Sequence, residues 1–207
     1  DQQCCQSSVD VLWQTPAGPA AWRTVMAPSD WDVNSDVSKW HDKTRKGYET
    51  YLGFITRHFP EPTTFDDFIY YGQTNQALAL QCGIEHWRSL RGRCMGTLFW
   101  QLNDCWATHS WSVIDSAGVP KVAYYQVKRS YAPRIVSIVK TGNRVTAHVV
   151  NDLTERIDAN IELSIRTFDG QLIVADRKAF RVDGDSALRD AAGVTLPGFF
   201  ADSPEEV

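Results

Sequence analysis

One stretch of sequence decides how the rest is interpreted: Cys94-Met95-Gly96-Thr97-Leu98-Phe99-Trp100-Gln101-Leu102-Asn103-Asp104-Cys105-Trp106. From Met95 to Leu102 this stretch carries no charge and almost no polar alternation. A strand with this pattern must be covered on both faces, as the strands of parallel sheets are. We therefore predict a parallel strand over residues 94–102 that is buried on both faces.

Polar and aromatic side chains follow this predicted strand directly, namely Asn103, Asp104, Trp106, His109 and Trp111. In parallel α/β proteins, ligands bind at the carboxyl ends of the strands. Flat apolar rings beside hydrogen-bonding groups suit a sugar, because a sugar has apolar C–H faces and a rim of hydroxyls. The three tryptophans near the strand end therefore favour carbohydrate stacking, and aromatic packing in the core is the alternative.

The composition is that of an ordinary globular protein. The chain has 207 residues, of which 43% are hydrophobic and 22% charged. This length can bury a sizeable core in one or two domains. A net charge of -4 gives no indication of a nucleic acid or an anionic membrane as partner. No run approaches the ~20 apolar residues of a membrane span, so we expect no membrane association.

The cysteines and the N-terminal residues bear on two further features, a metal site and a signal peptide. The five cysteines are an odd count, and Cys94 and Cys105 are not spaced as zinc ligands, so we predict no metal site. The first residues lack the basic and apolar segments of a signal peptide. The compartment stays open on this sequence, and a cytoplasmic location is only our default assumption.

The elements around the strand fit an α/β barrel. Periodic apolar residues predict a helix from Lys43 to His58 and a long helix over residues 63–91 that ends at Gly92. A further helix is predicted to open at Pro120 and to close at Pro133. Helix, buried strand and helix in this order form the repeat of a (β/α)8 barrel.

After Pro133 the pattern changes to alternation. We predict strands over 135–139, 145–150, 159–165 and 172–182, and no clear element from Asp183 onward. Antiparallel strands of this kind are typical of an immunoglobulin-like β-sandwich. A complete barrel needs about 200 residues and a complete sandwich about seven strands. We therefore predict a fragment, α/β and then all-β, with the end of a (β/α)8 barrel over 1–132 and part of a sandwich over 133–207. Residues 1–20 are poorly patterned.

The quoted stretch also carries a resemblance to a known family. It is similar to the last barrel strand of the β-mannosidases of glycoside hydrolase family 2. The likeness covers about half of the chain and includes Phe59-Pro60, Phe65-Asp66-Asp67-Phe68, Gln76-Ala77-Leu78-Ala79, Ile84-Glu85-His86-Trp87-Arg88, Ser110-Trp111-Ser112, Ile114-Asp115, Ala123-Tyr124-Tyr125, Lys128-Arg129 and Ala132-Pro133. It implies retaining hydrolysis of terminal non-reducing β-D-mannose residues from β-mannosides or oligosaccharides, without a cofactor.

The resemblance leaves the catalytic carboxyl groups incomplete. Retaining glycosidases use two carboxyl groups about 5 Å apart, and in this family both are glutamates. Trp13-Gln14 resembles the continuation of the nucleophile strand, which places Asp10 at the nucleophile position. Aspartate is one methylene shorter, and misplacement of this order can cost ~10²-fold in rate. Alternatively, Asp10 has no role, because the match fails over the whole of Asp1–Val11. The acid/base would lie upstream of residue 1.

For substrate binding the resemblance points to Trp100, Asp104, Asn103, Trp106 and Trp111. In the family, the equivalent of Trp100 walls the subsite of the cleaved sugar, and a core tryptophan is the alternative. Asp104 would bind sugar hydroxyls or fix a loop, and Asn103 would bind sugar or make a structural turn bond. Trp106 and Trp111 would line the aglycone side or pack the loop. His109 is a weak candidate.

Two functions remain open on the sequence. The first is a β-mannosidase fragment, which we expect to be inactive and prone to aggregation by itself. The second is a non-catalytic remnant that binds carbohydrate or serves as a structural or interaction module, with the missing part of the parent chain as its partner.

Overall fold

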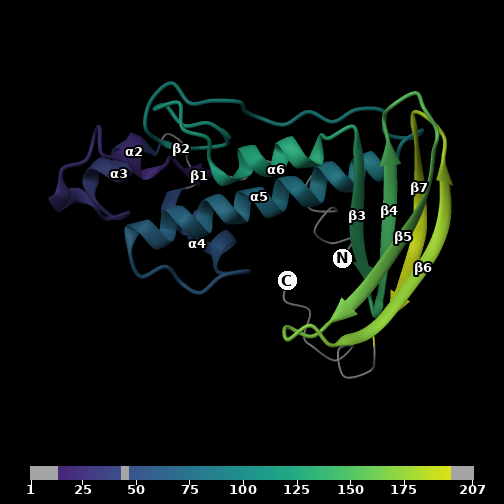
Figure 1. The fold of residues 1–207 in the computed structure, drawn as a ribbon. Coiled ribbons are helices and arrows are strands. Elements are labelled where there is room, and N and C mark those ends of the chain that lie inside the picture. The colour runs from purple at the N-terminus through teal and green to yellow at the C-terminus, as the bar shows by residue number, and fades with distance from the viewer. Residues whose placement is uncertain (1–13, 43–46, 197–207) are drawn as a thin grey trace. The chain divides into compact units, whose positions relative to one another are not determined.

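The structure is a computed structural model that describes residues 14–42 and 47–196 (Figure 1). It combines helices with antiparallel sheets. The chain divides into two compact units, which are described separately. The helical unit contains the described residues of Asp10–Gln81 and Leu98–Lys128, and the sheet unit contains those of Cys82–Thr97 and Arg129–Glu205. The predicted boundary at residues 132/133 stays a prediction.

The helical unit is built from short elements around one long helix. Its elements are β1 (Thr15–Pro16), α2 (Pro19–Trp22), the 3-10 helix η1 (Pro28–Asp30), α3 (Asp36–His41), α4 (Gly47–Ile55), α5 (Phe65–Ser89), β2 (His109–Ser110) and α6 (Val122–Ser130). The last residues of α5 and α6 belong to the sheet unit. β1 pairs antiparallel with β2. Within the described residues, α4, α5 and α6 confirm the three predicted helices. No described helix has both the length and the apolar character needed to cross a bilayer.

Local signals explain why α5 begins and ends where it does. The Thr64 hydroxyl accepts a 3.0 Å hydrogen bond from the Asp67 backbone N–H, and the Thr64 N–H donates to the Asp67 carboxylate at 3.1 Å. These reciprocal bonds satisfy N–H groups that the first turn leaves free. After the last turn, Gly92 has φ +94°, a conformation that side chains disfavour.

The helical unit has an aromatic core. Trp22 and Phe68 are fully buried, and Tyr51, Ile55 and Phe65 are at most 3% exposed. The Trp22 ring meets Phe65 edge to face, with ring centroids 5.7 Å apart. Rings in this geometry add to the free energy gained from burial. These aromatic side chains therefore serve the packing of the core.

The predicted buried strand over residues 94–102 is wrong. The segment forms no regular strand, and Met95, Leu98, Trp100 and Leu102 are 66%, 97%, 61% and 58% exposed. A parallel strand needs a hydrogen-bonded neighbour and cover on both faces. Among the described residues no strand pairs with 94–100, and this lack of partners explains the exposure.

The sheet unit consists of two antiparallel sheets (Figure 1). The three-stranded sheet has the order β3 (Arg134–Thr141), β4 (Arg144–Asn151) and β7 (Ser186–Thr195). β5 (Ile157–Arg166) pairs with β6 (Leu172–Val182). Strands β3 to β6 confirm the predicted strands. The prediction missed β7, which pairs with β4 across a register shift between Ala147 and Val149.

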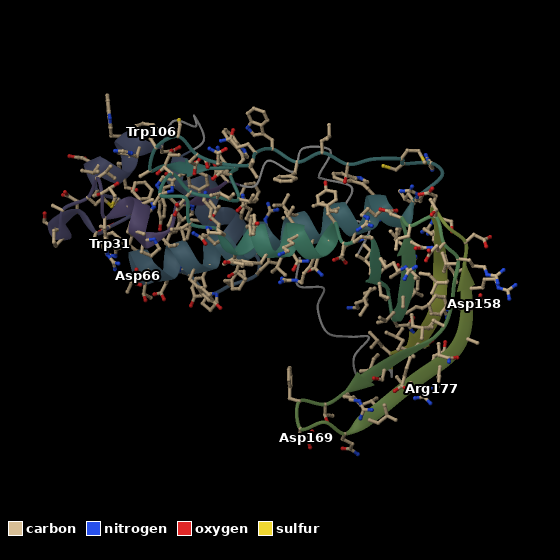
Figure 2. The ribbon with its side chains drawn as sticks, turned by 45° about the horizontal axis from the view of Figure 1, so that its top comes forward. Trp31, Asp66, Trp106, Asp158, Asp169 and Arg177 are labelled. Carbon is tan, nitrogen blue, oxygen red and sulfur yellow. The ribbon has the colours of Figure 1, made fainter. Side chains whose placement is uncertain are left out.

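Both sheets contribute to one apolar core. Its buried residues include Val149 of β4, Ile161 and Leu163 of β5, and Ala192 and Val194 of β7. Alternate side chains of a strand point to opposite faces, so the other face of β5 and β6 is free for charges. Asp158 of β5 carries an exposed ion pair with Arg181, and Figure 2 shows Asp158 and Arg177 on this pair of strands. Exposed pairs of this kind contribute little to stability.

Candidate functional site

The segment that carries Trp100 is joined to a second segment by backbone hydrogen bonds. Trp100 is 61% exposed, and its peptide bond to Gln101 is cis. The Gln101 N–H donates to the Trp111 carbonyl at 3.2 Å, and the Asp104 N–H donates to the Ile114 carbonyl at 3.1 Å. Residues 101–104 and 111–114, which we call the paired segments, thus lie side by side. Trp100 immediately precedes the first of these segments.

Asp104 lies at the other end of the first paired segment and is buried. Its side chain is 2% exposed. The carboxylate accepts a 2.6 Å hydrogen bond from the Ser112 hydroxyl, and the Lys121 Nζ lies 3.3 Å away. This environment matches the loop-fixing alternative for Asp104. A role in binding sugar stays a prediction, and it would require the side chain to become accessible.

Lys121 is a buried cation that the sequence analysis did not identify. Its side chain is fully buried, and the contact with Asp104 is an ion pair without good hydrogen-bond geometry. Burial lowers the pKa of Lys121 to about 8, although the charges of Asp104 and Asp115 oppose this shift. Desolvation of the ammonium group is therefore the larger effect.

Asp115 fixes the turn that leads to Lys121. Its carboxylate accepts hydrogen bonds from three backbone N–H groups, those of Gly18 at 3.1 Å and of Ala117 and Val119 at 3.0 Å each. A Cβ atom on residue 18 would lie only 2.8 Å from the Asp115 oxygen. The approach between the two residues therefore requires glycine at position 18.

His109 is a core residue rather than an accessible base. It is 4% exposed, and its ring lies against Trp22 and Tyr51, with centroid distances of 4.8 and 5.5 Å. The Ser38 hydroxyl lies 3.1 Å from the His109 Nε2. Burial lowers the pKa of His109 to about 3, so the ring is neutral at ordinary pH.

The remaining candidates have mixed surroundings. Trp106 is half-buried and stacks on His41 at 4.7 Å, while the Trp111 carbonyl accepts from the Gln76 side chain at 3.0 Å. Asn103 is exposed, and its amide donates to the Asp104 carbonyl at 3.2 Å. The binding roles of Trp106, Trp111 and Asn103 stay predictions. Asp10 lies outside the described residues.

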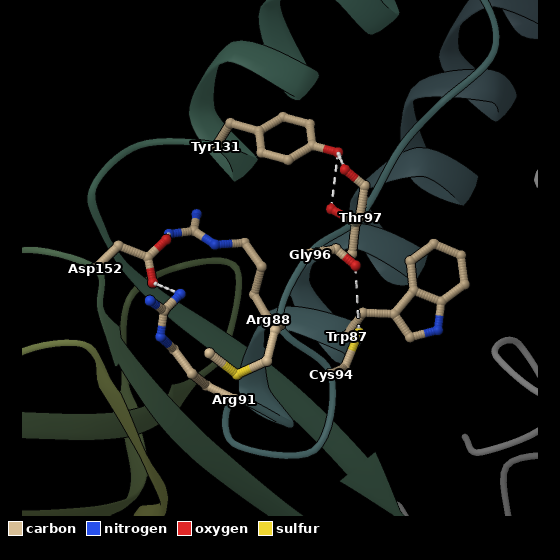
Figure 3. A pocket seen from close by; sticks show the side chains of 9 residues that line it. Trp87, Arg88, Arg91, Cys94, Gly96, Thr97, Tyr131 and Asp152 are labelled. Carbon is tan, nitrogen blue, oxygen red and sulfur yellow. Dashed lines mark hydrogen bonds and ion pairs between the residues drawn. The ribbon is translucent and has the colours of Figure 1, made fainter.

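The sheet unit contains a hollow of its own, shown in Figure 3. It is lined by Trp87, Arg88, Arg91, Cys94, Met95, Gly96, Thr97, Tyr131 and Asp152. Arg88 and Arg91 each form a 2.7 Å ion pair with Asp152, and Arg91 also pairs with Asp185 at 2.8 Å. Because carboxylates already neutralise both guanidinium groups, the hollow is not built to bind an anion.

Glu85 has a hydrogen-bond partner in α6, and the described residues contain no metal cluster. Glu85 of α5 accepts a 3.1 Å hydrogen bond from the Ser130 hydroxyl of α6. Within residues 14–42 and 47–196, no group of three or more histidine, cysteine or acidic side chains could hold a metal ion.

Comparison with known proteins identifies what the chain is similar to. β-Mannosidase B of Aspergillus niger is 36% identical over 108 residues, which is 50% of this chain and 13% of that protein. β-Mannosidase B of Thermothelomyces thermophilus is 32% identical over 151 residues, which is 69% of this chain and 17% of that protein. The crystal structure of a β-D-mannosidase from Dictyoglomus thermophilum matches 89% of this chain with a TM-score of 0.77 and 29% identity. The chain resembles a segment of a family 2 β-mannosidase.

The other comparisons set the limits of this result. An exo-chitosanase from Amycolatopsis orientalis has a TM-score of 0.72 at 16% identity, so it shares the fold alone. No family model matches the chain. The chain spans 23% of the Dictyoglomus enzyme and less than a fifth of the fungal relatives. The resemblance predicted from the sequence is confirmed, and the activity of a whole β-mannosidase is a matter for proposal.

Proposed function

We propose that this chain supplies the last part of the catalytic barrel and part of the following immunoglobulin-like sandwich of a retaining β-mannosidase. The observation that carries the proposal is the match to the Dictyoglomus β-D-mannosidase over 89% of the chain. The fungal relatives, named as β-mannosidases, support the same function. All of these are enzymes by name, so they do not favour a non-catalytic remnant.

Residues 94–102 form no strand in the structure, and in this proposal further parts of the enzyme cover them. Their exposure counts against a barrel that the described residues could close by themselves. Leu98 and Leu102 are apolar, and covering them would remove apolar surface from water, which is favourable. Their exposure therefore supports a surface that another part of the enzyme covers. The boundary between barrel and sandwich falls at residues 132/133.

The proposed chemistry assigns roles to Asp10 and to four of the candidate binding residues. The exposed Trp100 ring stacks on the C–H face of the terminal mannose, and Asn103 offers an amide to its hydroxyls. Trp106 and Trp111 line the aglycone side. Asp10 holds the position of the nucleophile, and the acid/base comes from a preceding part of the enzyme. Two carboxyl groups about 5 Å apart then act by covalent displacement, without a cofactor.

A hybrid enzyme tests this function. Residues 94–131 would replace the equivalent segment of the Dictyoglomus β-D-mannosidase, and hydrolysis of a chromogenic β-mannoside would be measured beside a β-glucoside. We expect the hybrid enzyme to hydrolyse the β-mannoside preferentially. A hybrid that folds, as judged by circular dichroism, and has no activity would contradict the proposal.

The chain by itself provides a second measurement. We expect the 207-residue protein to hydrolyse no chromogenic β-mannoside, because loss of one catalytic proton transfer alone costs about 10²–10⁴-fold. Robust turnover that Asp10→Asn abolishes would show that the catalytic groups lie within this chain.

A further inference from the structure

A buried ion pair joins Asp104, which follows Trp100 by four residues, to Lys121. We propose that Asp104 and Lys121 are positioning residues, which hold residues 101–104 in place and thereby orient the Trp100 ring without contacting the sugar themselves. The part of this proposal that concerns sugar rests on the proposed function. The fixing of the segment does not depend on it.

The backbone geometry makes Lys121 a bridge between chain segments. Its N–H donates to the Val113 carbonyl at 2.9 Å, while its Nζ lies 3.3 Å from the Asp104 carboxylate. The Val113 N–H in turn donates to the Gln101 carbonyl at 3.1 Å. Lys121 therefore contacts both paired segments, the second through its backbone N–H and the first through its side chain.

Two neutral side chains complete the arrangement. The Ser112 hydroxyl donates to the Asp104 carboxylate at 2.6 Å, which ties the second paired segment to the first. The Gln76 amide of α5 donates to the carbonyls of Trp111 and Ser112 at 3.0 and 3.3 Å. The pair is thus held in a polar network that is anchored to the long helix.

Burial favours a positioning role over direct binding. The side chains of Asp104 and Lys121 are 2% and 0% exposed, whereas Trp100, a few residues before Asp104, is 61% exposed. Buried ion pairs are often no more stabilising than apolar side chains of the same size, although breaking one is costly. A buried ion pair instead fixes the positions of the segments that carry its two charges. Here one of these segments is residues 101–104, which follows the exposed Trp100.

Amide hydrogen exchange on the 207-residue chain tests the proposal. The reporters are the hydrogen-bonded amides of Gln101, Asp104 and Ile114, and the Met26 amide, bonded to the Trp22 carbonyl at 2.9 Å, is the reference in the same unit. Lys121→Met removes the cation and keeps the length of the side chain. The neutral double variant D104N/K121M removes both charges.

We expect Lys121→Met to speed exchange at the three reporters about 100-fold, as for a broken buried pair, with little change at Met26. The double variant should restore slow exchange, which loss of packing would not allow. Unchanged reporters, an equal rise at Met26, or no recovery in the double variant would each overturn the proposal.

If Lys121→Met does not fold, Asp104→Asn serves as the second variant. It keeps an acceptor for Ser112 and should speed exchange at the reporters about tenfold, because the opposing charge is lost. No local change would overturn the proposal. Since no sugar or turnover enters these measurements, their failure is distinguishable from failure of the proposed function.

Discussion

Replacing Asp115 with alanine should destabilise the helical unit strongly. The change removes the acceptor of three backbone N–H groups, of which that of Gly18 is buried and those of Ala117 and Val119 are partly buried. A buried donor without a partner costs about 1–3 kcal/mol, and the two partly buried donors can still reach water at a smaller cost. We therefore expect the free energy of unfolding to fall by about 3 kcal/mol.

Urea unfolding followed by tryptophan fluorescence measures this change, because Trp22 is fully buried in the same unit. Asp66→Ala is the matched control, since Asp66 accepts one exposed 3.3 Å hydrogen bond from the Trp31 indole (Figure 2). It should change the free energy of unfolding by at most about 0.5 kcal/mol. If Asp115→Ala unfolds at the same urea concentration as the control, the role assigned to the Asp115 turn is wrong.

A further prediction concerns the core of the helical unit. Phe68→Ala should lower the free energy of unfolding by about 3–5 kcal/mol, measured in the same urea experiment, because the side chain is fully buried and leaves a cavity; a loss similar to that of Asp66→Ala would contradict the described core.

The long helix could be predicted because its signals are local. Thr64 and Asp67 lie within one turn of each other and cap the helix regardless of the rest of the fold. The state of residues 94–102 could not be predicted in the same way, because the burial of a strand depends on neighbours far along the chain. An uncharged sequence shows that the segment needs cover, and it does not show which residues provide it.

Only part of the candidate site could be predicted from the sequence. Asp104 was identified from its place after the apolar stretch, but Lys121 at the start of a helix has the pattern of a solvated charge. Only the fold brings its Nζ to 3.3 Å from Asp104. β7 was missed for a related reason: Ser186–Thr195 contains small and charged residues, and its pairing with β4 comes from tertiary structure.

The most direct test of the central claim is the effect of Trp100→Ala on kcat/KM of the hybrid enzyme with a chromogenic β-mannoside. If Trp100 walls the mannose subsite, kcat/KM should fall about 10- to 100-fold, which corresponds to about 1.4–3 kcal/mol of lost transition-state stabilisation. The melting temperature should hardly change, because the ring is 61% exposed and supports little of the core. An unchanged kcat/KM in a folded variant would contradict the proposed place of Trp100 in a β-mannosidase site.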